Sequence, residues 1–160
     1  RGFDTILVEH PGLIWRIVAT CGRYSAICDD LKQEVALALW RAVPSWRGDC
    51  TLRTFVARVT HNVCVSHVRR AVREPSCSEL SDTLPSDREG PEDSVARADL
   101  SRRLTAAVAT LPTGLREVAT LTLEGFSTQE IAYTLGINEG AVFTRATRAK
   151  AALREAMVRQ

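Results

Sequence analysis

The chain has 160 residues, which is enough for one mid-sized domain or two small ones. With 45% apolar and 25% charged residues, its composition excludes a long disordered chain and a collagen-like chain. No apolar stretch reaches the roughly 18 residues that a membrane span requires. The five cysteines form no Cys-x-x-Cys pair, so we expect free thiols in a reducing, cytoplasmic compartment.

The net charge of +2 is unevenly distributed along the chain. Residues 1–75 hold 11 basic and 7 acidic residues, which gives +4. Residues 76–95 hold 1 and 6, which gives −5, and residues 96–160 hold 9 and 6, which gives +3. Two basic blocks separated by an acidic segment indicate two surfaces that can meet a polyanion such as a nucleic acid.

Three amphipathic helices are predicted in the first block. Apolar residues repeat at steps of three and four over 13–21, 31–43 and 52–63, and the third helix is expected to reach Arg73. Pro44 ends the second helix because proline has no amide hydrogen to donate. An alternating strand pattern occurs nowhere in the sequence, so the predicted fold class is all-α.

Residues 74–95 contain three prolines, five serines and an acidic run. This composition is typical of a linker rather than of a packed element. We therefore expect two small helical domains, residues 1–74 and 96–160, joined by a flexible acidic linker over 75–95.

The second block contains a predicted helix-turn-helix. Ser127 and Glu130 have the spacing of a capping box, which starts a short helix that Gly136 ends. Asn138 caps the next helix, which is expected to run to about Met157. Two further helices are expected before this motif, over 95–110 and 113–124. A short helix, a turn with glycine and a longer helix are the elements of a helix-turn-helix.

The last helix has two faces. Its buried stripe is predicted to consist of Val142, Ala146, Ala149 and Leu153. The opposite face carries Phe143, Thr144, Arg145, Thr147, Arg148 and Lys150. Such donors can reach base edges and phosphates from a recognition helix, although a plain helical hairpin with a solvated basic face is the alternative.

A row of polar side chains is predicted on the helix that ends near Arg73. The row consists of Arg58, Asn62, Ser66, Arg69 and Arg73, which lie within about 80° of one another. Cations and amides in a line suit a strand backbone or exposed bases. A solvated helix face explains the same pattern equally well.

His61, Cys64 and His67 invite a metal-site interpretation. Because His61 and His67 lie about 120° apart on a helix, they do not face one cation together. We expect these three side chains to be buried or half-buried instead, and we predict no metal and no cofactor. An enzyme such as a metallohydrolase is disfavoured because the sequence has no HExxH motif, glycine-rich phosphate loop or nucleophile motif.

Several segments together carry a family resemblance. In the first block they are 29–35 (DDLKQEV), 38–42 (ALWRA), 46–55 (WRGDCTLRTF) and 67–70 (HVRR). In the second they are 111–112 (LP), 116–118 (REV), 124–127 (EGFS), 130–132 (EIA), 135–137 (LGI) and 142–149 (VFTRATRA). These segments resemble, in order, those of bacterial RNA polymerase sigma factors, and the chain is similar to the small extracytoplasmic-function (ECF) group.

The resemblance implies a transcription initiation factor with no catalytic chemistry of its own. The residues implied to bind core RNA polymerase are Asp30, Gln33, Glu34, Leu37 and Arg41. Those implied to hold the melted −10 element are Arg47, Gly48, Asp49, Thr51, Arg53, Arg58, Asn62, Ser66, Arg69 and Arg73. Those implied to bind the duplex −35 element are Arg116, Thr144, Arg145, Thr147, Arg148 and Lys150. By their position in the family Trp46 and Phe55 are expected in the core, and stacking on unpaired bases of the −10 element is the alternative.

The resemblance also implies an anti-sigma factor as a partner, without membrane insertion of the chain itself. One departure from the family pattern is Phe143, which stands where a basic residue is usual. The main alternative function is a helix-turn-helix transcriptional regulator that works without polymerase. Such a regulator typically dimerises on paired half-sites, and it has no use for the acidic-start helix at 29–35.

Overall fold

The computed structural model describes residues 4, 6, 9–21, 25–73 and 94–159. Within these ranges the chain is helical and has no strand, which confirms the predicted fold class. The elements are α2 (Pro11–Cys21), α3 (Ser25–Ala42), the 3-10 helix η1 (Val43–Ser45), α4 (Leu52–Arg73), α5 (Ser94–Ala109), α6 (Thr113–Leu123), α7 (Thr128–Leu135) and α8 (Glu139–Val158). Most of the predicted linker, 74–93, lies outside the described residues.

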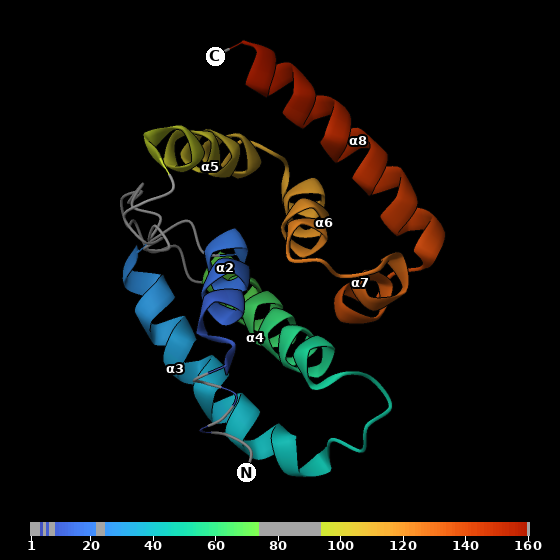
Figure 1. The fold of residues 1–160 in the computed structure, drawn as a ribbon. Helices are drawn as coiled ribbons and strands as arrows, with labels where there is room; N and C mark the ends of the chain where they lie inside the picture. Colours follow the sequence, from blue (N-terminus) through green and yellow to red (C-terminus); the bar gives the residue numbers. More distant parts are fainter. Residues whose placement is uncertain (1–3, 5, 7–8, 22–24, 74–93, 160) are drawn as a thin grey trace.

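The first three described helices pack around an apolar core (Figure 1). Leu31, Val35 and Leu39 recur every four residues on α3, and all three are fully buried. They pack with Val18 from α2 and Val56 from α4. The periodicity of the sequence therefore predicted the inward faces of these helices.

A loop reverses the chain between α3 and α4. Pro44 lies in the single 3-10 turn after α3, and Gly48 has a positive φ of 83°. The side chain of Thr51 accepts a hydrogen bond from the amide of Thr54 at 3.2 Å and so caps the start of α4. The prediction that Trp46 lies in the core is wrong: its side chain is 36% exposed, and its Nε1 donates to the carbonyl of Cys50 at 3.0 Å. Phe55 is half-buried.

The helix-turn-helix forms as predicted from its local signals. The amide of Glu130 donates to Ser127 Oγ at 3.1 Å, and the amide of Ser127 donates to Glu130 Oε1 at 2.9 Å, so the capping box is complete. Gly136 ends α7 in the left-handed conformation with φ 70°. The side chain of Asn138 accepts from the amide of Ala141 at 2.7 Å and caps α8. α5 packs against α6 and α8.

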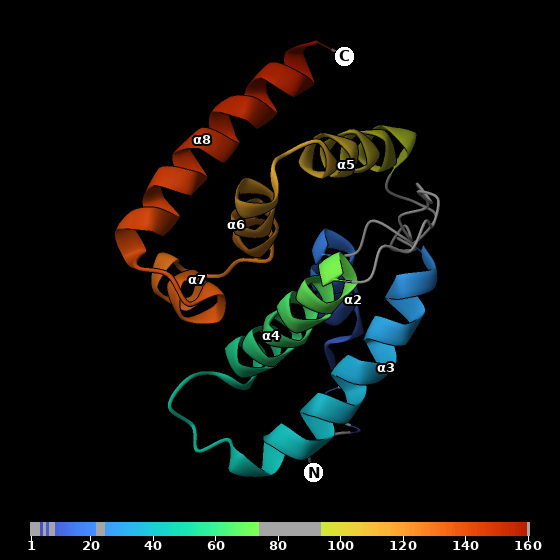
Figure 2. The same ribbon diagram turned by 180° about the vertical axis from the view of Figure 1, so that it is seen from behind.

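The two predicted domains are in direct contact in this arrangement. Figure 2 shows α2 and α4 between α3 on one side and the α6–α7 pair on the other. One apolar cluster joins both parts: Leu13, Ile17, Ala57, Val118, Leu121, Phe126, Ile131, Ala132 and Val142. The sequence pattern did not predict this shared core. Every helix in the described ranges is too short or too polar to cross a bilayer.

Candidate nucleic-acid interface

The N-terminal half of α8 presents polar side chains to solvent. Thr144, Thr147, Arg148 and Lys150 are exposed, as the two-faced pattern predicted. The hydroxyl of Thr144 donates to the carbonyl of Gly140 at 3.0 Å, and that of Thr147 donates to the carbonyl of Phe143 at 2.9 Å. Each threonine hydroxyl thus donates to the helix backbone, and its oxygen can still accept a hydrogen bond beside the cationic side chains.

Two arginines of the predicted −35 set are placed differently. Arg145 is half-buried, and its guanidinium carbon lies 3.6 Å from where a Cβ on Gly114 would stand, so it lies against the first turn of α6. Arg116 donates from Nε to the carbonyl of Thr20 at 3.1 Å and from Nη1 to that of Leu111 at 3.4 Å. In this arrangement Arg116 joins α6 to the end of α2.

The polar row on α4 is divided into an open part and a covered part. Asn62, Ser66 and Arg69 are exposed, and the side chain of Arg73 is outside the described residues. Arg58 is half-buried because it donates to the carbonyl of Tyr133 at 2.7 Å and lies 4.3 Å above the Tyr133 ring. Burial first, and then a hydrogen bond with Cys50, raise the pKa of Tyr133, so its phenol stays neutral.

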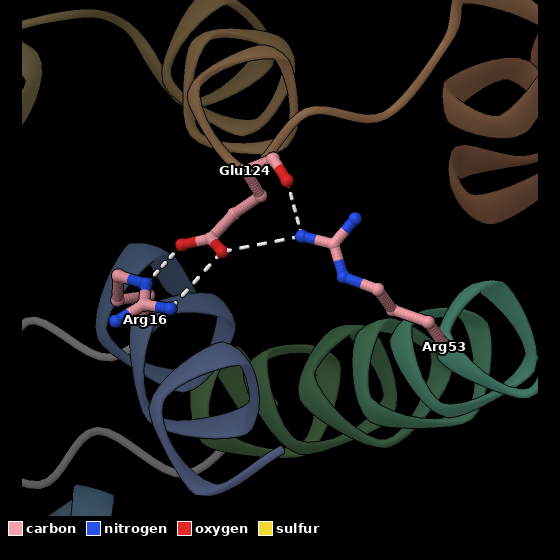
Figure 3. Close-up of polar contacts among 3 residues, drawn as sticks. All are labelled: Arg16, Arg53 and Glu124. Atoms are coloured by element: carbon pink, nitrogen blue, oxygen red, sulfur yellow. Dashed lines mark hydrogen bonds and ion pairs between the residues drawn. The ribbon is translucent and has the colours of Figure 1, made fainter. Parts of the chain in front are cut away.

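Arg53, another residue of the predicted −10 set, is also engaged with the second part of the chain. It donates to the backbone carbonyl of Glu124, and its Nη2 lies 3.5 Å from Glu124 Oε2 (Figure 3). Arg16 from α2 donates to the same carboxylate with Nε, and with Nη2 at 3.0 Å. The side chain of Glu124 is only 13% exposed between the two guanidinium groups.

The capping box of α7 adds a polar contact between the two parts. The hydroxyl of Thr54 donates to Glu130 Oε2 at 2.8 Å. The hydrogen bond from the backbone amide of Ser127, followed by the one from the Thr54 hydroxyl, holds the pKa of Glu130 below its ordinary value. The carboxylate that caps α7 therefore also binds α4.

The loop before α4 is open to solvent. Arg47, Gly48, Asp49 and Thr51 are all exposed, and Thr51 is the residue that caps α4. An open loop with a backbone turn at Gly48 allows a close approach by a ligand. The two ends of the predicted −10 surface, this loop and the Asn62–Arg69 segment, are thus accessible, whereas Arg53 and Arg58 between them are half-buried against the second part of the chain.

His61, Cys64 and His67 occupy the places that the packing interpretation predicted. His61 and Cys64 are buried, and His67 is half-buried with Nδ1 3.4 Å from Glu34 Oε2. Cys50 and Cys64, the cysteines among the described side chains, are free thiols.

The outward face of α3 carries most of the predicted polymerase contacts. Asp30, Gln33, Leu37 and Arg41 are exposed, and their steps of three and four residues place them on one side of the helix. Glu34 is instead half-buried and pairs with Arg70 at 3.0 Å.

Sequence reasoning missed one residue of this face. Trp40 is 60% exposed beside Leu37, which is 48% exposed. Trp40 comes three residues after Leu37 and directly after Leu39, the last residue of the buried stripe. This spacing places Trp40 on the exposed face of α3 together with Leu37.

Comparison with known proteins identifies the chain. Residues 7–74 match the model of Sigma-70 region 2, and residues 101–153 match that of Sigma-70 region 4. The RNA polymerase sigma factor CnrH of Cupriavidus metallidurans is 30% identical over 162 residues, which cover 96% of this chain and 85% of CnrH. The ECF sigma factor SigM of Mycobacterium tuberculosis is 29% identical, over 94% of this chain and 74% of SigM. This chain is an ECF RNA polymerase sigma factor.

A solved structure shows the same fold. The sigma factor RpoE of Bartonella quintana, in complex with the anti-sigma factor NepR, matches 97% of this sigma factor with a TM-score of 0.78 and 19% identity, and 96% of RpoE is covered. The family prediction is confirmed, and this sigma factor is a transcription initiation factor that binds RNA polymerase and directs it to promoters. The individual residue roles stay predictions.

Proposed function

We propose that this sigma factor works through three separate surfaces, two for promoter DNA and one for core polymerase. Residues 1–74 and 96–160 act as two modules in this proposal. The observation that carries it is the capped helix-turn-helix, because its second helix exposes Arg148, Lys150 and two threonine oxygens on the face opposite its buried stripe. A recognition helix places such groups in the major groove, here that of the −35 element.

The first module holds the non-template strand of the −10 element. The support is the exposed loop at 47–51 and the exposed residues Asn62, Ser66 and Arg69 on α4. Melting the duplex exposes unstacked bases and a flexible backbone, which amides and guanidinium groups bind through hydrogen bonds and charge. Arg53 and Arg58 join this surface once the second module releases them.

The outward face of α3 binds core polymerase. It combines charged groups at Asp30 and Arg41 with apolar area at Leu37 and Trp40, and tight protein interfaces need both. Glu34 supports this face from the side through its pair with Arg70. The face points away from α6 and α7, so polymerase can bind it while the two modules stay in contact.

The remaining predictions concern partners and compartment. The sigma factor has no catalytic activity of its own, needs no cofactor and works in the cytoplasm. Since RpoE forms a complex with the anti-sigma factor NepR, we propose that this chain also binds an anti-sigma factor. Each DNA contact is weak alone, and affinity multiplies when polymerase fixes the separation of the two modules.

Run-off transcription tests this function. Core polymerase with the chain is expected to start transcription from a subset of a randomised promoter library, and core polymerase alone is not. The chain alone is expected to show no specific promoter binding at physiological salt. Tight, sequence-specific binding by the free chain, with no initiation when core is added, would instead support the polymerase-independent regulator.

A further inference from the structure

A carboxylate of α3 meets two nitrogen-bearing side chains of α4 beside the proposed polymerase face. Glu34 Oε2 accepts a hydrogen bond from Arg70 Nη2 at 3.0 Å, and it lies 3.4 Å from His67 Nδ1. The side chain of Glu34 is 38% exposed, whereas that of His67 is only 19% exposed. Because α3 packs along α4, these three side chains join the proposed polymerase face to the helix behind it.

Both contacts use the same oxygen of the Glu34 carboxylate. Among the residues that the structure describes, no hydrogen bond or ion pair engages Glu34 Oε1. Glu34 lies between exposed Gln33 and, about one turn farther along, exposed Leu37, which places it at the edge of the polymerase face. Since each carboxylate oxygen accepts hydrogen bonds, Oε1 can accept from a donor outside the chain while Oε2 stays with α4.

The ring nitrogen of His67 is the unusual member of this group. Nδ1 is buried, and no hydrogen bond from the described residues satisfies it. Without a proton, Nδ1 sets a lone pair opposite the lone pairs of Glu34 Oε2, and a buried acceptor in that position is costly. A proton on Nδ1 makes the contact attractive, and the imidazolium form also adds a positive charge.

Glu34 is the charged group that faces His67 across the contact between α3 and α4. On α4 itself, the titratable residues about one turn from His67 are Arg70 and the buried thiol of Cys64. α2 and α7 also pack against α4, and their titratable groups have other partners: Arg16 with Glu124, Glu130 with Thr54, and Tyr133 with Arg58. A change in the protonation of His67 therefore acts first on Glu34.

We propose that His67 is a positioning residue that controls how available Glu34 is to core polymerase. As an imidazolium, His67 donates from Nδ1 to Glu34 Oε2 and adds a second positive charge beside Arg70. As a neutral imidazole it adds no charge, so a cationic group of polymerase competes with Arg70 but not with His67. The proposal rests on the proposed function in assigning Glu34 to polymerase. It adds that core binding tightens as the pH rises through the neutral range.

Two opposing effects decide this sign. The imidazolium fixes the rotamer of Glu34, which lowers the entropy that binding costs, but Arg70 already holds the same oxygen. The imidazolium also repels a cation that approaches the carboxylate, and Arg70 does not remove that repulsion. Repulsion therefore prevails, and protonation of His67 weakens core binding.

A His67→Gln variant tests the proposal. The affinity of the full chain for immobilised core polymerase is measured for the variant and the wild type at two pH values. Because titration of polymerase affects both proteins alike, the ratio of their affinities isolates His67. We expect the variant to bind about threefold more tightly than the wild type at about pH 6, and equally at about pH 8. The same ratio at both pH values would overturn the proposal.

The matched control is His10→Gln. His10 precedes α2, is half-buried and lies 4.0 Å from Glu9, so the control removes a histidine that also neighbours a carboxylate. It leaves the contact between α3 and α4 intact, and its pH dependence should match that of the wild type. A gain in acid equal to that of His67→Gln would contradict the specific role of His67.

Glu34→Gln shows whether His67 acts through the carboxylate. This variant is expected to bind core more weakly at both pH values, because it loses a proposed contact. In its background, His67→Gln should no longer change the affinity at about pH 6. A remaining gain of about threefold in the double variant would mean that His67 acts through another group, and the proposal would be wrong.

Circular dichroism and urea denaturation at both pH values show whether each variant is folded. If His67→Gln does not fold, Glu34→Gln decides the question, since it retains His67. Its affinity should change with pH about threefold less than that of the wild type, and an equal change would contradict the proposal. The proposed function is tested separately: intact core binding with pH-independent ratios rejects only the role of His67, whereas no core binding by the wild type at either pH rejects the function.

Discussion

The polar side chains of α4 and the outer face of α8 differ in how much of each surface is bound by other parts of the chain. On α8, Thr144, Thr147, Arg148 and Lys150 face solvent with nothing packed over them in the described chain. On α4, Arg53 and Arg58 are bound by residues of the second module. Most of the predicted −35 residues are exposed, although Arg116 is bound to α2 and Arg145 lies against α6, whereas two residues of the predicted −10 set are bound by the second module.

The roles proposed for the two surfaces belong to different steps of transcription initiation. Duplex DNA is present before melting, so a recognition helix can bind it at once. A surface for single-stranded DNA is useful only after the strands separate, and an exposed row of arginines would bind other polyanions before then. Among the described side chains of that row, Arg58 is bound by the second module, whereas Asn62, Ser66 and Arg69 stay exposed.

The largest expected effect comes from breaking the shared core. Leu121 is 3% exposed and packs with residues of α2, α4 and α7. Leu121→Ala should lower the free energy of unfolding by about 2–5 kcal/mol, because it removes buried methyl groups and leaves a cavity. Urea denaturation measures this loss. Leu37→Ala is the matched control, since Leu37 is exposed on α3 and its loss should leave stability nearly unchanged.

The next largest effect is expected on the outward face of α3, which we propose binds core polymerase. Trp40→Ala should weaken binding to core polymerase by about 2 kcal/mol or more, because large exposed aromatic residues are typical anchors of protein interfaces. Fluorescence titration with core enzyme measures it. Trp46→Ala makes the same change on the loop, away from α3, and should leave core binding intact. Equal losses in both variants would show that the tryptophans act through stability instead.

The recognition helix allows a comparison between two exposed arginines of α8. Arg148→Ala should reduce −35-dependent initiation by about 1–3 kcal/mol, the value of a good base contact. Arg154→Ala removes the same charge about two turns farther along the helix, beyond the proposed DNA surface, and should have little effect. Run-off transcription at fixed salt separates them. If Arg154→Ala is as damaging as Arg148→Ala, general charge and not base recognition is responsible.

Local signals in the sequence predicted the ends of the helix-turn-helix and the end of α3 well. The start of α3 was predicted wrongly, because the helix begins at Ser25 and has no acidic residue in its first turn. The capping box, Gly136, Asn138 and Pro44 act on residues within a few positions of themselves, so neighbours in sequence suffice to interpret them. The all-α fold and the inward faces of the helices follow from the spacing of apolar residues in the same way.

The covering of the −10 surface could not be predicted from such signals. Arg53 and Arg58 bind residues 71 and 75 positions away, so nothing near them in sequence distinguishes them from exposed Arg69. Trp46 was placed wrongly because its position in the family favoured the core, although the chain has already left α3 and turned into the loop. The partners of a side chain across an interface depend on packing that periodicity does not encode.

The smallest expected effect concerns the capping carboxylate that joins α7 to α4. Because the pKa of Glu130 is lower in the folded chain than its ordinary value of 4.5, its ionised form stabilises the fold above about pH 4.5. That stability is lost as the pH falls through the lowered pKa. Glu130→Gln should therefore be less stable than the wild type at pH 7, by about 1 kcal/mol, and the difference should disappear in acid.

Urea denaturation at several pH values checks both the sign and the location of this effect. Glu155→Gln changes an exposed carboxylate at the far end of α8, where an ion pair contributes little, and should follow the wild type closely at every pH. A difference between wild type and Glu130→Gln that persists at low pH would mean that the ionised carboxylate is not what stabilises the cap. The contact between Thr54 and Glu130 would then contribute through packing alone. The polar contacts that join the two parts would be the pairs of Glu124 with Arg16 and Arg53 and the hydrogen bonds that Arg58 and Arg116 donate to carbonyls of the opposite part.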